Sequence, residues 1–462
     1  MKNKKKYNNC TKHGHCDDCD SKDICSEWAN FITKGQHDNS SKHYGAKPYA
    51  HFDKRVSLLM GAVRQYVMNP EKIIKHGFYP FIHFRKRSSR YGKNKRIKFR
   101  DLYYCSHLDR CVYQRYAFLI NYKYNIWSKT NGLDNIAIAY RNNNGKSNIE
   151  FARDAFDAIS KFDKSFIFVG DFTNFFDELQ HSYLKTMLCK VLEVDVLPKD
   201  YYAVFKNITR FSSWDWEKII KVTGMSNIRG IRKKLNHRDV LLSKEEFKKN
   251  KTDICKNTSG KGIPQGSPIS AVLSNVYMIE FDQWLKEYAT HNNGIYMRYS
   301  DDFIIVLPYN NIDDIEDYKS STLSFIMSMD GLVKLQAEKT SYYIYSNKKV
   351  YSYPDKQLSI IDYLGFVFEG DNIRMRPRSI TKYYYRMRRK AYNIVKNNWM
   401  SPKGKRITAK RLYNIYSKND KGQTFITYAK RARRIMNLND LEINALISRH
   451  KQKISIALKG IR

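Results

Sequence analysis

The stretch Tyr299-Ser300-Asp301-Asp302-Phe303-Ile304-Ile305-Val306-Leu307 places two adjacent acids at a turn between two apolar runs, 296–299 and 303–307. Short apolar runs on either side of a polar turn are typical of buried strands joined by a tight hairpin. Taken alone, Asp301 and Asp302 would be explained by an ordinary Asp-rich turn. Two further blocks at compatible spacing favour a chemical role instead.

Upstream, Phe168-Val169-Gly170-Asp171-Phe172-Thr173-Asn174-Phe175-Phe176 carries one more carboxylate just after an apolar run that is expected to be a strand at 165–169, and an aromatic ring follows five residues later. Between the two acidic blocks, Gly262-Ile263-Pro264-Gln265-Gly266-Ser267-Pro268 is a rigid turn that opens into a helix expected over 269–288. Asp171 and Asp301 are 130 residues apart in the chain, so they meet only if two buried strands lie side by side.

Three carboxylates gathered in this way suit nucleotidyl transfer. In that reaction a 3′-hydroxyl attacks an α-phosphate, and negative charge builds on the attacking and the leaving oxygen. Two Mg²⁺ ions about 3.5–4 Å apart stabilise both oxygens, and such hard cations prefer carboxylate ligands. The acids Asp171, Asp301 and Asp302 are therefore predicted to bind two Mg²⁺ ions.

In these blocks and in their order, from about residue 96 to about residue 390, the chain resembles the reverse transcriptases. The resemblance implies an α+β fold of the right-hand polymerase type, with a palm of antiparallel strands backed by helices and a mostly helical C-terminal part. It implies fingers at 29–152 and a palm at 153–370. Within the palm, the Lys-rich segment 212–261 is expected to be a basic insertion, and a helical thumb and C-terminal region follow at 371–462.

The resemblance also implies roles for single residues. Asp171, Asp301 and Asp302 correspond to the catalytic metal ligands, and the backbone carbonyl of Phe172 corresponds to a further ligand. Phe176 corresponds to the aromatic steric gate that lies under the sugar and excludes a 2′-hydroxyl.

The other implied roles concern the incoming nucleotide and the primer. Gln265 lies in the turn that contacts nucleotide and template. The residues that correspond to triphosphate contacts are Arg110, Arg141 and Lys339, and those of the primer-grip hairpin are Tyr363 and Gly365. The family usually has Ala where this chain has Ser300, and since a small residue is retained, activity is still expected.

Within the family, the match is closest to the bacterial defence-associated and abortive-infection enzymes, on the stretches 171–177 and 139–152. This implies an RNA-directed DNA polymerase in antiviral defence, with a noncoding RNA as template, DNA as product, dNTPs as substrates, and a second protein subunit or a homo-oligomer. A retron-type or intron-type enzyme, and template-independent or protein-primed synthesis, stay open because they use the same residues. A non-enzymatic RNA-binding scaffold is disfavoured, because paired buried acids are unfavourable without a metal.

Composition agrees with a nucleic-acid partner. The chain of 462 residues has 83 Lys and Arg against 45 Asp and Glu, a formal net charge of +38. Charge of this size favours polyanions, because neutralised phosphates release counterions. The basic residues directly after the palm, predicted to hold template–primer phosphates, are Arg374, Arg376, Arg386, Arg388 and Arg389. We find no run of about 18 apolar residues, so a cytoplasmic protein without membrane spans is expected.

The N-terminal segment 1–28 is rich in cysteine and histidine. Its spacing is Cys-x5-Cys-x2-Cys-x5-Cys with two histidines inside, and the residues are Cys10, His13, His15, Cys16, Cys19 and Cys25. Thiolates and imidazoles at such spacing suit a tetrahedral Zn²⁺ ion. The second half of the usual two-knuckle pattern is missing. A zinc site and an unstructured tail that holds thiols therefore both stay open.

Overall fold

The computed structural model describes residues 24, 26–32, 45–89, 97–141, 145–226, 230–401, 404–417, 424–438 and 441–460. The six candidate zinc ligands lie outside the described residues. The chain forms two compact units that interleave in sequence. The first comprises Met1–Arg141, Phe172–Gln283 and Ser328–Lys334, and the second comprises Asn142–Asp171, Trp284–Met327 and Leu335–Arg462. In the described part of the chain, no helix combines the length and the apolar character needed to cross a bilayer.

The first unit contains a four-stranded sheet in the order β2-β1-β4-β5. β1 (Phe81–Ser89) and β2 (Ile97–Tyr104) form a long antiparallel pair, β4 (Ser212–Asp215) runs parallel to β1, and β5 (Cys255–Lys256) is antiparallel to β4. The longest helix of the unit is α5 (His107–Thr130), whose N-terminus is capped by the Ser106 side chain, an acceptor for the Asp109 amide. Further helices of this unit include α3 (Gly61–Val67), α4 (Pro70–Ile74), α7 (Phe175–Glu178), α8 (His181–Leu192), α9 (Lys199–Thr209), α10 (Trp216–Val222), α11 (Ile231–Leu235), α12 (Lys244–Lys249), the 3₁₀ turn η3 (Lys251–Asp253) and α13 (Ser270–Tyr277).

The segment expected to be a basic insertion, 212–261, packs into the first unit through its apolar residues. Trp214 on β4 is fully buried, and its ring lies 5.4 Å from that of Phe52 and 5.6 Å from that of Phe247. α10 and α11 add buried Ile and Leu side chains to the same cluster. The Lys-rich composition of the segment therefore did not indicate the small apolar core that it contains.

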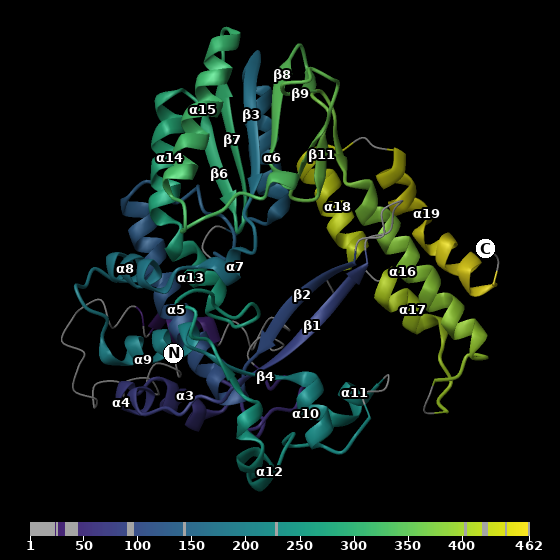
Figure 1. Cartoon of the computed structure of the whole chain (residues 1–462). Coiled ribbons are helices and arrows are strands. Elements are labelled where there is room, and N and C mark those ends of the chain that lie inside the picture. The colour runs from purple at the N-terminus through teal and green to yellow at the C-terminus, as the bar shows by residue number, and fades with distance from the viewer. Residues whose placement is uncertain are drawn as a thin grey trace, which may run out of the picture. The chain divides into compact units, whose positions relative to one another are not determined.

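The second unit is organised on a five-stranded antiparallel sheet in the order β6-β7-β3-β8-β9 (Figure 1). The central strand β3 (Lys164–Asp171) and its neighbour β7 (Asp302–Pro308) are apolar on both faces and almost wholly buried, as strands inside a sheet covered on both sides are. The flanking strands are β6 (Ile295–Tyr299), β8 (Ser341–Ser346) and β9 (Lys349–Ser352). The helices that accompany this sheet are α6 (Asn148–Ser160), α15 (Ile312–Ser328) and the 3₁₀ turn η4 (Ala337–Lys339), and α14 (Ile279–His291) continues into this unit from the first.

The C-terminal part of the second unit has a small sheet followed by helices. The sheet has the order β10-β11-β12, with antiparallel strands at Ile361–Tyr363, Phe366–Phe368 and Ile373–Met375. The helices are α16 (Pro377–Lys396), α17 (Ala409–Tyr416), α18 (Phe425–Met436) and α19 (Leu441–Leu458). α16 contributes Met387, Ala391 and Ile394 to a core shared with Leu412 of α17 and Ile454 of α19.

The predicted α+β fold class with antiparallel palm strands is confirmed. The strands expected at 165–169, 296–299 and 303–307 are each present and differ from the prediction by one or two residues at an end. The single helix expected over 269–288 is instead two helices, α13 and α14, because the backbone leaves the helical hydrogen-bond pattern at Met278. The boundaries of the fingers, palm and thumb remain predictions.

Trp214→Ala tests whether 212–261 belongs to the core of the first unit. Removing a fully buried indole leaves a cavity, so the free energy of unfolding should fall by about 3–5 kcal/mol. The matched control is Val196→Ala, at a side chain that is 74% exposed, where we expect a change within about 0.5 kcal/mol. Urea titrations of both variants measure the difference. Equal stability of the two variants would contradict the packing of this segment.

Candidate active site

The turn between β6 and β7 presents the paired acids. Tyr299 and Asp302 face each other across the two strands, so Ser300 and Asp301 form a two-residue hairpin loop. Ser300 has a φ of 63°, a region that disfavours residues with a side chain and that a hairpin turn of this length requires. Below the turn, the fully buried Arg298 donates from Nη1 to the Ser300 carbonyl at 2.8 Å. This charged donor supports the carbonyl of a strained turn, and the sequence patterns did not single it out.

The pairing of β3 with β7 brings two of the predicted aspartates together. In the antiparallel register, Asp171 is the direct partner of Asp302 at the ends of both strands. Directly paired residues in an antiparallel sheet have Cβ atoms about 4.5–5.5 Å apart, and like charges in such a pair repel each other. Asp301 is the neighbour of Asp302 in the adjoining turn, so all three predicted acids lie at one end of this sheet.

Gly170, directly before Asp171, is required by packing. It pairs with Phe303 across the two strands, and a Cβ atom at Gly170 would overlap the Phe303 ring. Phe303 is fully buried, so its ring could move away from such an atom only by displacing its neighbours. Glycine inside an apolar strand is a known sign of such a close approach, so the sequence held a signal for this residue. The contact determines which residues of β3 and β7 lie opposite each other, and hence the pairing of the acids.

The charges at this end of the sheet are unbalanced. Burial, followed by the negative charges of Asp301 and Asp171, raises the pKa of Asp302 from its ordinary 3.8 to about 7, while Lys339 and Arg376 act in the opposite direction. Lys339, at the end of η4, forms an ion pair with the Asp171 carboxylate. The Gln336 amide donates to the Asp171 carbonyl at 2.8 Å and anchors the segment that carries this lysine.

The donor set of the three aspartates is made only of carboxylate oxygens, which suits a hard cation such as Mg²⁺. Over the described ranges, no group of three or more His, Cys, Asp or Glu side chains is close enough together to bind a metal ion in this conformation. The positive charge nearest to Asp171 in this arrangement is that of Lys339. The residues fit a divalent cation by chemistry, and Lys339 occupies the position of a counter-charge.

In the first unit, the Pro-Gln-Gly turn is tied to the residue predicted as steric gate. The Ile263 amide donates to the Phe176 carbonyl at 2.9 Å, and the Tyr103 amide of β2 donates to the Gln265 carbonyl at 2.9 Å. Gly266 has a φ of 120°, and a Cβ atom there would overlap the carbonyl oxygen of Tyr103. Only glycine therefore fits at this position. The structure places Phe176 and Gln265 on segments joined by hydrogen bonds.

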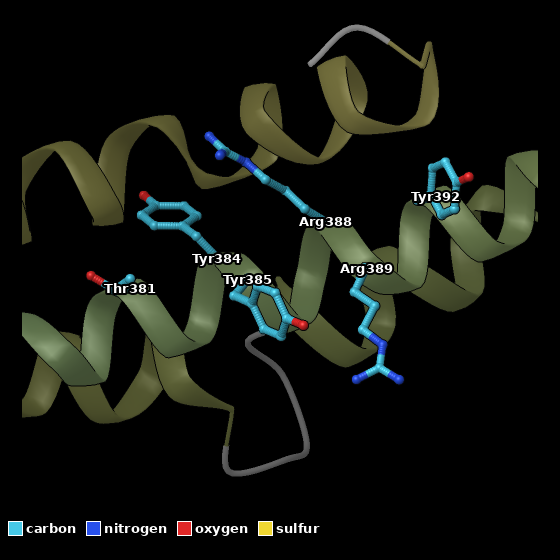
Figure 2. Close-up of a pocket in the computed structure, with 6 residues that line it drawn as sticks. All are labelled: Thr381, Tyr384, Tyr385, Arg388, Arg389 and Tyr392. Atoms are coloured by element: carbon cyan, nitrogen blue, oxygen red, sulfur yellow. The ribbon is translucent and has the colours of Figure 1, made fainter. Parts of the chain in front are cut away.

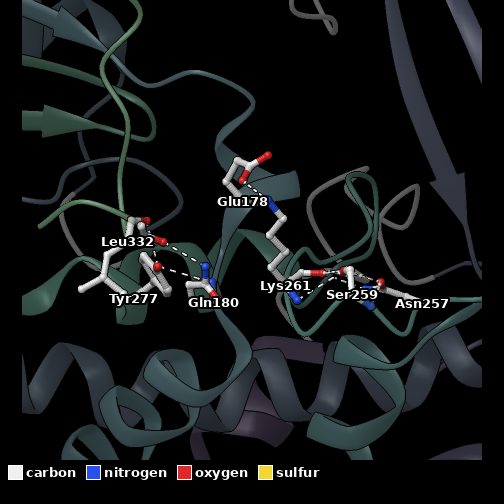
Figure 3. Close-up of polar contacts among 8 residues, drawn as sticks. Glu178, Gln180, Asn257, Ser259, Lys261, Tyr277 and Leu332 are labelled. Carbon is white, nitrogen blue, oxygen red and sulfur yellow. Dashed lines mark hydrogen bonds and ion pairs between the residues drawn. The ribbon is translucent and has the colours of Figure 1, made fainter.

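A polar network fixes the chain that leads into this turn (Figure 3). The Lys261 ammonium forms an ion pair with Glu178 at 2.6 Å, the Gln180 amide donates to the Tyr277 hydroxyl at 3.3 Å, and that hydroxyl donates to the Leu332 carbonyl at 2.8 Å. The remaining members, on the loop itself, are Asn257 and Ser259. The network links residues just after Phe176 to those just before Gln265, so it restrains both predicted nucleotide contacts.

Both arginines predicted to contact the triphosphate are buried in the first unit. Arg110 donates from Nη2 to the Gly45 carbonyl at 3.2 Å. Arg141 forms an ion pair with Asp134 and donates from Nε to Asn125 at 2.8 Å. In this conformation their guanidinium groups bond to their own unit, and their role at a triphosphate stays a prediction.

The predicted primer-grip residues lie on the β10–β11 hairpin of the second unit. Tyr363 pairs with Phe366, so Leu364 and Gly365 form the turn, both with positive φ. The Asn148 side chain donates to the Leu364 carbonyl at 2.9 Å and holds the turn from α6. Tyr363 is itself buried, the turn residues Leu364 and Gly365 are half-buried, and Asp362 of the same strand is exposed.

The five arginines predicted to hold phosphates divide into two sets. Arg374 forms an ion pair with Glu369, and Arg376 forms one with Asp362, so both are partly neutralised by acids of the small sheet. The other three are exposed on α16, and they are Arg386, Arg388 and Arg389. Two of the five charges are therefore partly balanced by acids, three lie exposed on one helix, and their role at phosphates stays a prediction.

The sequence profile of the family described as "Reverse transcriptase (RNA-dependent DNA polymerase)" matches residues 205–368. This part of the chain is therefore similar in sequence to reverse transcriptase domains. It includes Gln265, the Ser300–Asp301 turn, Asp302 and Lys339, whereas Asp171 lies before the matched segment. The chain has no sequence match among curated proteins.

Solved structures with a similar arrangement include polymerases of yeasts and of a virus. The apo telomerase of Candida tropicalis, truncated from its C-terminal domain, is 11% identical with a TM-score of 0.41, over 67% of this chain and 58% of that one. The Candida albicans telomerase in complex with a TWJ fragment of telomeric RNA is 13% identical with a TM-score of 0.38, over 90% and 70%. The RNA-dependent RNA polymerase of a human picobirnavirus is 12% identical with a TM-score of 0.34, over 63% and 43%. The chain thus spans less than two thirds of the first of these structures, and TM-scores below 0.5 add no detail to the site.

Asp302→Asn should stabilise the metal-free protein at alkaline pH. Between pH 3.8 and about 7, folded Asp302 holds a proton that the unfolded chain has released. The free energy of unfolding should therefore fall as the pH rises, by up to about 1.4 kcal/mol per pH unit, and the full penalty is present above about pH 7. Asparagine has no charge to desolvate, so the variant should lack this slope.

Urea titrations in the presence of a chelator, at about pH 5 and about pH 8, measure this difference. Asp313→Asn is the matched control, because it removes an exposed acid of α15 and should leave the pH slope unchanged. An advantage of Asp302→Asn that is the same at both pH values would contradict the raised pKa.

Proposed function

We propose that the chain is an RNA-directed DNA polymerase that uses two-metal nucleotidyl transfer at Asp171, Asp301 and Asp302. The observation that carries the proposal is the direct pairing of Asp171 with Asp302 at the ends of two buried strands, beside the turn that holds Asp301. A protein that only binds RNA has no use for opposed acids in a buried sheet, where they repel each other and lower stability. The similarity of residues 205–368 to reverse transcriptase domains supports the same activity.

Each residue near the aspartates has a proposed role. Asp171, Asp301, Asp302 and the Phe172 carbonyl would bind two Mg²⁺ ions. Bound there, the ions supply charge stabilisation at the attacking and leaving oxygens. The pKa of Asp302 is raised by its burial first and then by the negative charges of Asp301 and Asp171, and a divalent cation would neutralise those charges more fully than Lys339 can. Lys339, a mobile single charge at the same site, is the proposed contact of the triphosphate.

Nucleotide choice is assigned to the first unit. Phe176 is proposed to lie under the sugar and Gln265 to contact the incoming nucleotide and the template. Their joint support through the Ile263 and Tyr103 amides is consistent with this, because a steric gate discriminates only if its position is held. Arg110 and Arg141 are proposed as triphosphate contacts, although each now bonds within its own unit.

The proposed biological setting is bacterial antiviral defence in the cytoplasm. The template would be a noncoding RNA, the product DNA, and the partner a second protein subunit or another copy of the chain. The support for this setting is the likeness of stretches 171–177 and 139–152 to defence-associated and abortive-infection enzymes. Sequencing the RNA that co-purifies with the protein, with any DNA attached to it, tests the setting. Recovery of only random cellular RNA without complementary DNA would count against it.

Asp301→Ala with Asp302→Ala tests the catalytic role. Removal of two metal ligands should lower dNTP incorporation on a primed RNA template, with Mg²⁺, by at least about a thousand-fold. The melting temperature should stay the same or rise, because two repelling charges are removed. The control is Asp313→Ala with Asp317→Ala, which removes two exposed acids of α15 and should leave incorporation unchanged. Wild-type incorporation by the first double variant would refute the assignment.

Phe176→Ala tests sugar selection. If the ring clashes with a 2′-hydroxyl, its removal should raise the ratio of ribonucleotide to deoxyribonucleotide incorporation by about tenfold or more. Phe99→Ala is a matched control, because its ring is 54% exposed on β2 and lies on a different segment from the Pro-Gln-Gly turn. Single-nucleotide incorporation kinetics with each sugar give the ratio. An unchanged ratio for Phe176→Ala would place the gate at another residue.

A further inference from the structure

The outer face of α16 is the most strongly basic helical surface of the second unit that the predicted roles do not fully explain. The helix has seven Lys and Arg residues and no Asp or Glu. Its apolar stripe (Ile380, Tyr383, Met387, Ala391 and Ile394) is buried. Tyr384 packs against the edge of that core, whereas Arg386, Arg388 and Arg389 are exposed. Within the helix itself, nothing neutralises their charge, so a polyanion is the partner that this face favours.

This face also carries a hollow of about 500 Å³ (Figure 2). Its lining combines aromatic rings with guanidinium groups, and the residues are Thr381, Tyr384, Tyr385, Arg388, Arg389 and Tyr392. Tyr385 is 45% exposed and Tyr392 is 58% exposed. The two tyrosines are seven residues apart, so they lie on the same side of the helix, about 10 Å from each other along its axis. Figure 2 shows Arg388 and Arg389 between them along the helix.

Exposed tyrosine rings distinguish this surface from a site that binds only the phosphates of a nucleic acid. A site that only neutralises phosphates needs charge, and a run of lysines and arginines supplies it without aromatic side chains. Aromatic faces add affinity where unpaired bases can stack on them, because every base has an accessible π-face once it leaves a duplex. In a duplex, base faces are covered by the neighbouring pairs, so the rings would gain little there.

The ion pairs in the second unit point to the same subset of arginines. Arg374 and Arg376 are engaged by Glu369 and Asp362. Among the described residues, Arg388 and Arg389 form no ion pair with an acid, and both are exposed. The charges of Arg388 and Arg389, beside the tyrosines, are therefore available for phosphates.

We propose that the hollow on α16 binds unpaired nucleotides of single-stranded RNA, with bases stacked on Tyr385 and Tyr392 and phosphates held by Arg388 and Arg389. This goes beyond the proposed polymerase activity, and rests on it only for the choice of RNA as the strand. The site would hold template, or another part of a bound RNA, in unpaired form. The two tyrosine rings lie about two helical turns apart on α16. They would therefore stack on two bases that are separated along the RNA strand.

Equilibrium binding separates stacking from charge alone. Fluorescence anisotropy of the full chain is measured with a single-stranded RNA oligonucleotide and with a blunt RNA duplex of the same length. Tyr385→Ala with Tyr392→Ala should weaken single-strand binding by roughly 5- to 150-fold for each ring that stacks. Duplex affinity should change by less than about twofold, because the rings do not reach its base faces.

Two control variants keep the test specific. Tyr385→Phe with Tyr392→Phe retains both rings and should bind single strands within about twofold of the wild type. Tyr202→Ala removes a ring on α9 that is 44% exposed and also lies beside a lysine, Lys185, and it should have no effect.

Arg388→Ala with Arg389→Ala should lower the salt dependence of single-strand binding, by about 0.7 in the log–log slope for each phosphate that the variant no longer neutralises.

The outcomes distinguish this inference from the proposed activity. An equal weakening on single strand and duplex, or no weakening on either, would overturn the stacking site without bearing on nucleotide incorporation. A selective weakening on single strands supports the site even if the wild type incorporates no nucleotide. Asp301→Ala with Asp302→Ala should abolish synthesis and keep wild-type affinity for single-stranded RNA, since those acids are not part of α16.

Discussion

The direct opposition of Asp171 and Asp302 across two neighbouring strands is the constraint on which the rest of the second unit depends. Because side chains alternate along a strand, a shift of one residue in the pairing of β3 and β7 would turn one of the acids to the other face. The contact between Gly170 and Phe303 opposes such a shift. The Phe303 ring fills the space that a side chain at position 170 would need, so Phe303 requires glycine as its partner on β3. The fully apolar interiors of both strands provide the burial that keeps two repelling carboxylates in place.

The features around this pair are unfavourable for stability in isolation. Ser300 adopts a positive φ, Arg298 is a buried cation, and Asp302 has a pKa raised to about 7. Conformational and electrostatic strain of this kind persists only where the surrounding structure enforces it, and it clusters at functional sites. Arg298 and Lys339 each offset part of it, one at the turn carbonyl and the other at the Asp171 carboxylate. The strain thus coincides with the residues that the proposed chemistry requires.

In the first unit, the surrounding structure also holds the predicted nucleotide contacts in place, but it does so through uncharged backbone groups. The turn that carries Gln265 depends on backbone hydrogen bonds to Phe176 and Tyr103, and on glycines that permit close approach of two chain segments. On α16, by contrast, the inferred RNA site is built from exposed side chains on a rigid helix, and no strain is needed to present them. One type of site positions reacting groups within narrow limits, and the other offers a tolerant surface for a flexible strand.

The sequence by itself determined the elements whose identity depends on local pattern. Apolar runs with bounding turn residues predicted β3, β6 and β7 to within one or two residues, and the order of the acidic and Pro-Gln-Gly blocks indicated the family whose profile matches residues 205–368. Only the tertiary structure decided what depends on contacts between distant residues. These contacts are the register that opposes Asp171 to Asp302, the support of Ser300 by Arg298, and the burial of Trp214 within a Lys-rich segment. They also include the ion pairs that Arg374 and Arg376 form with Glu369 and Asp362. The physical reason is that hydrophobic periodicity shows which face of one element is buried, whereas a contact with a residue far away in the chain produces no periodic pattern in the sequence.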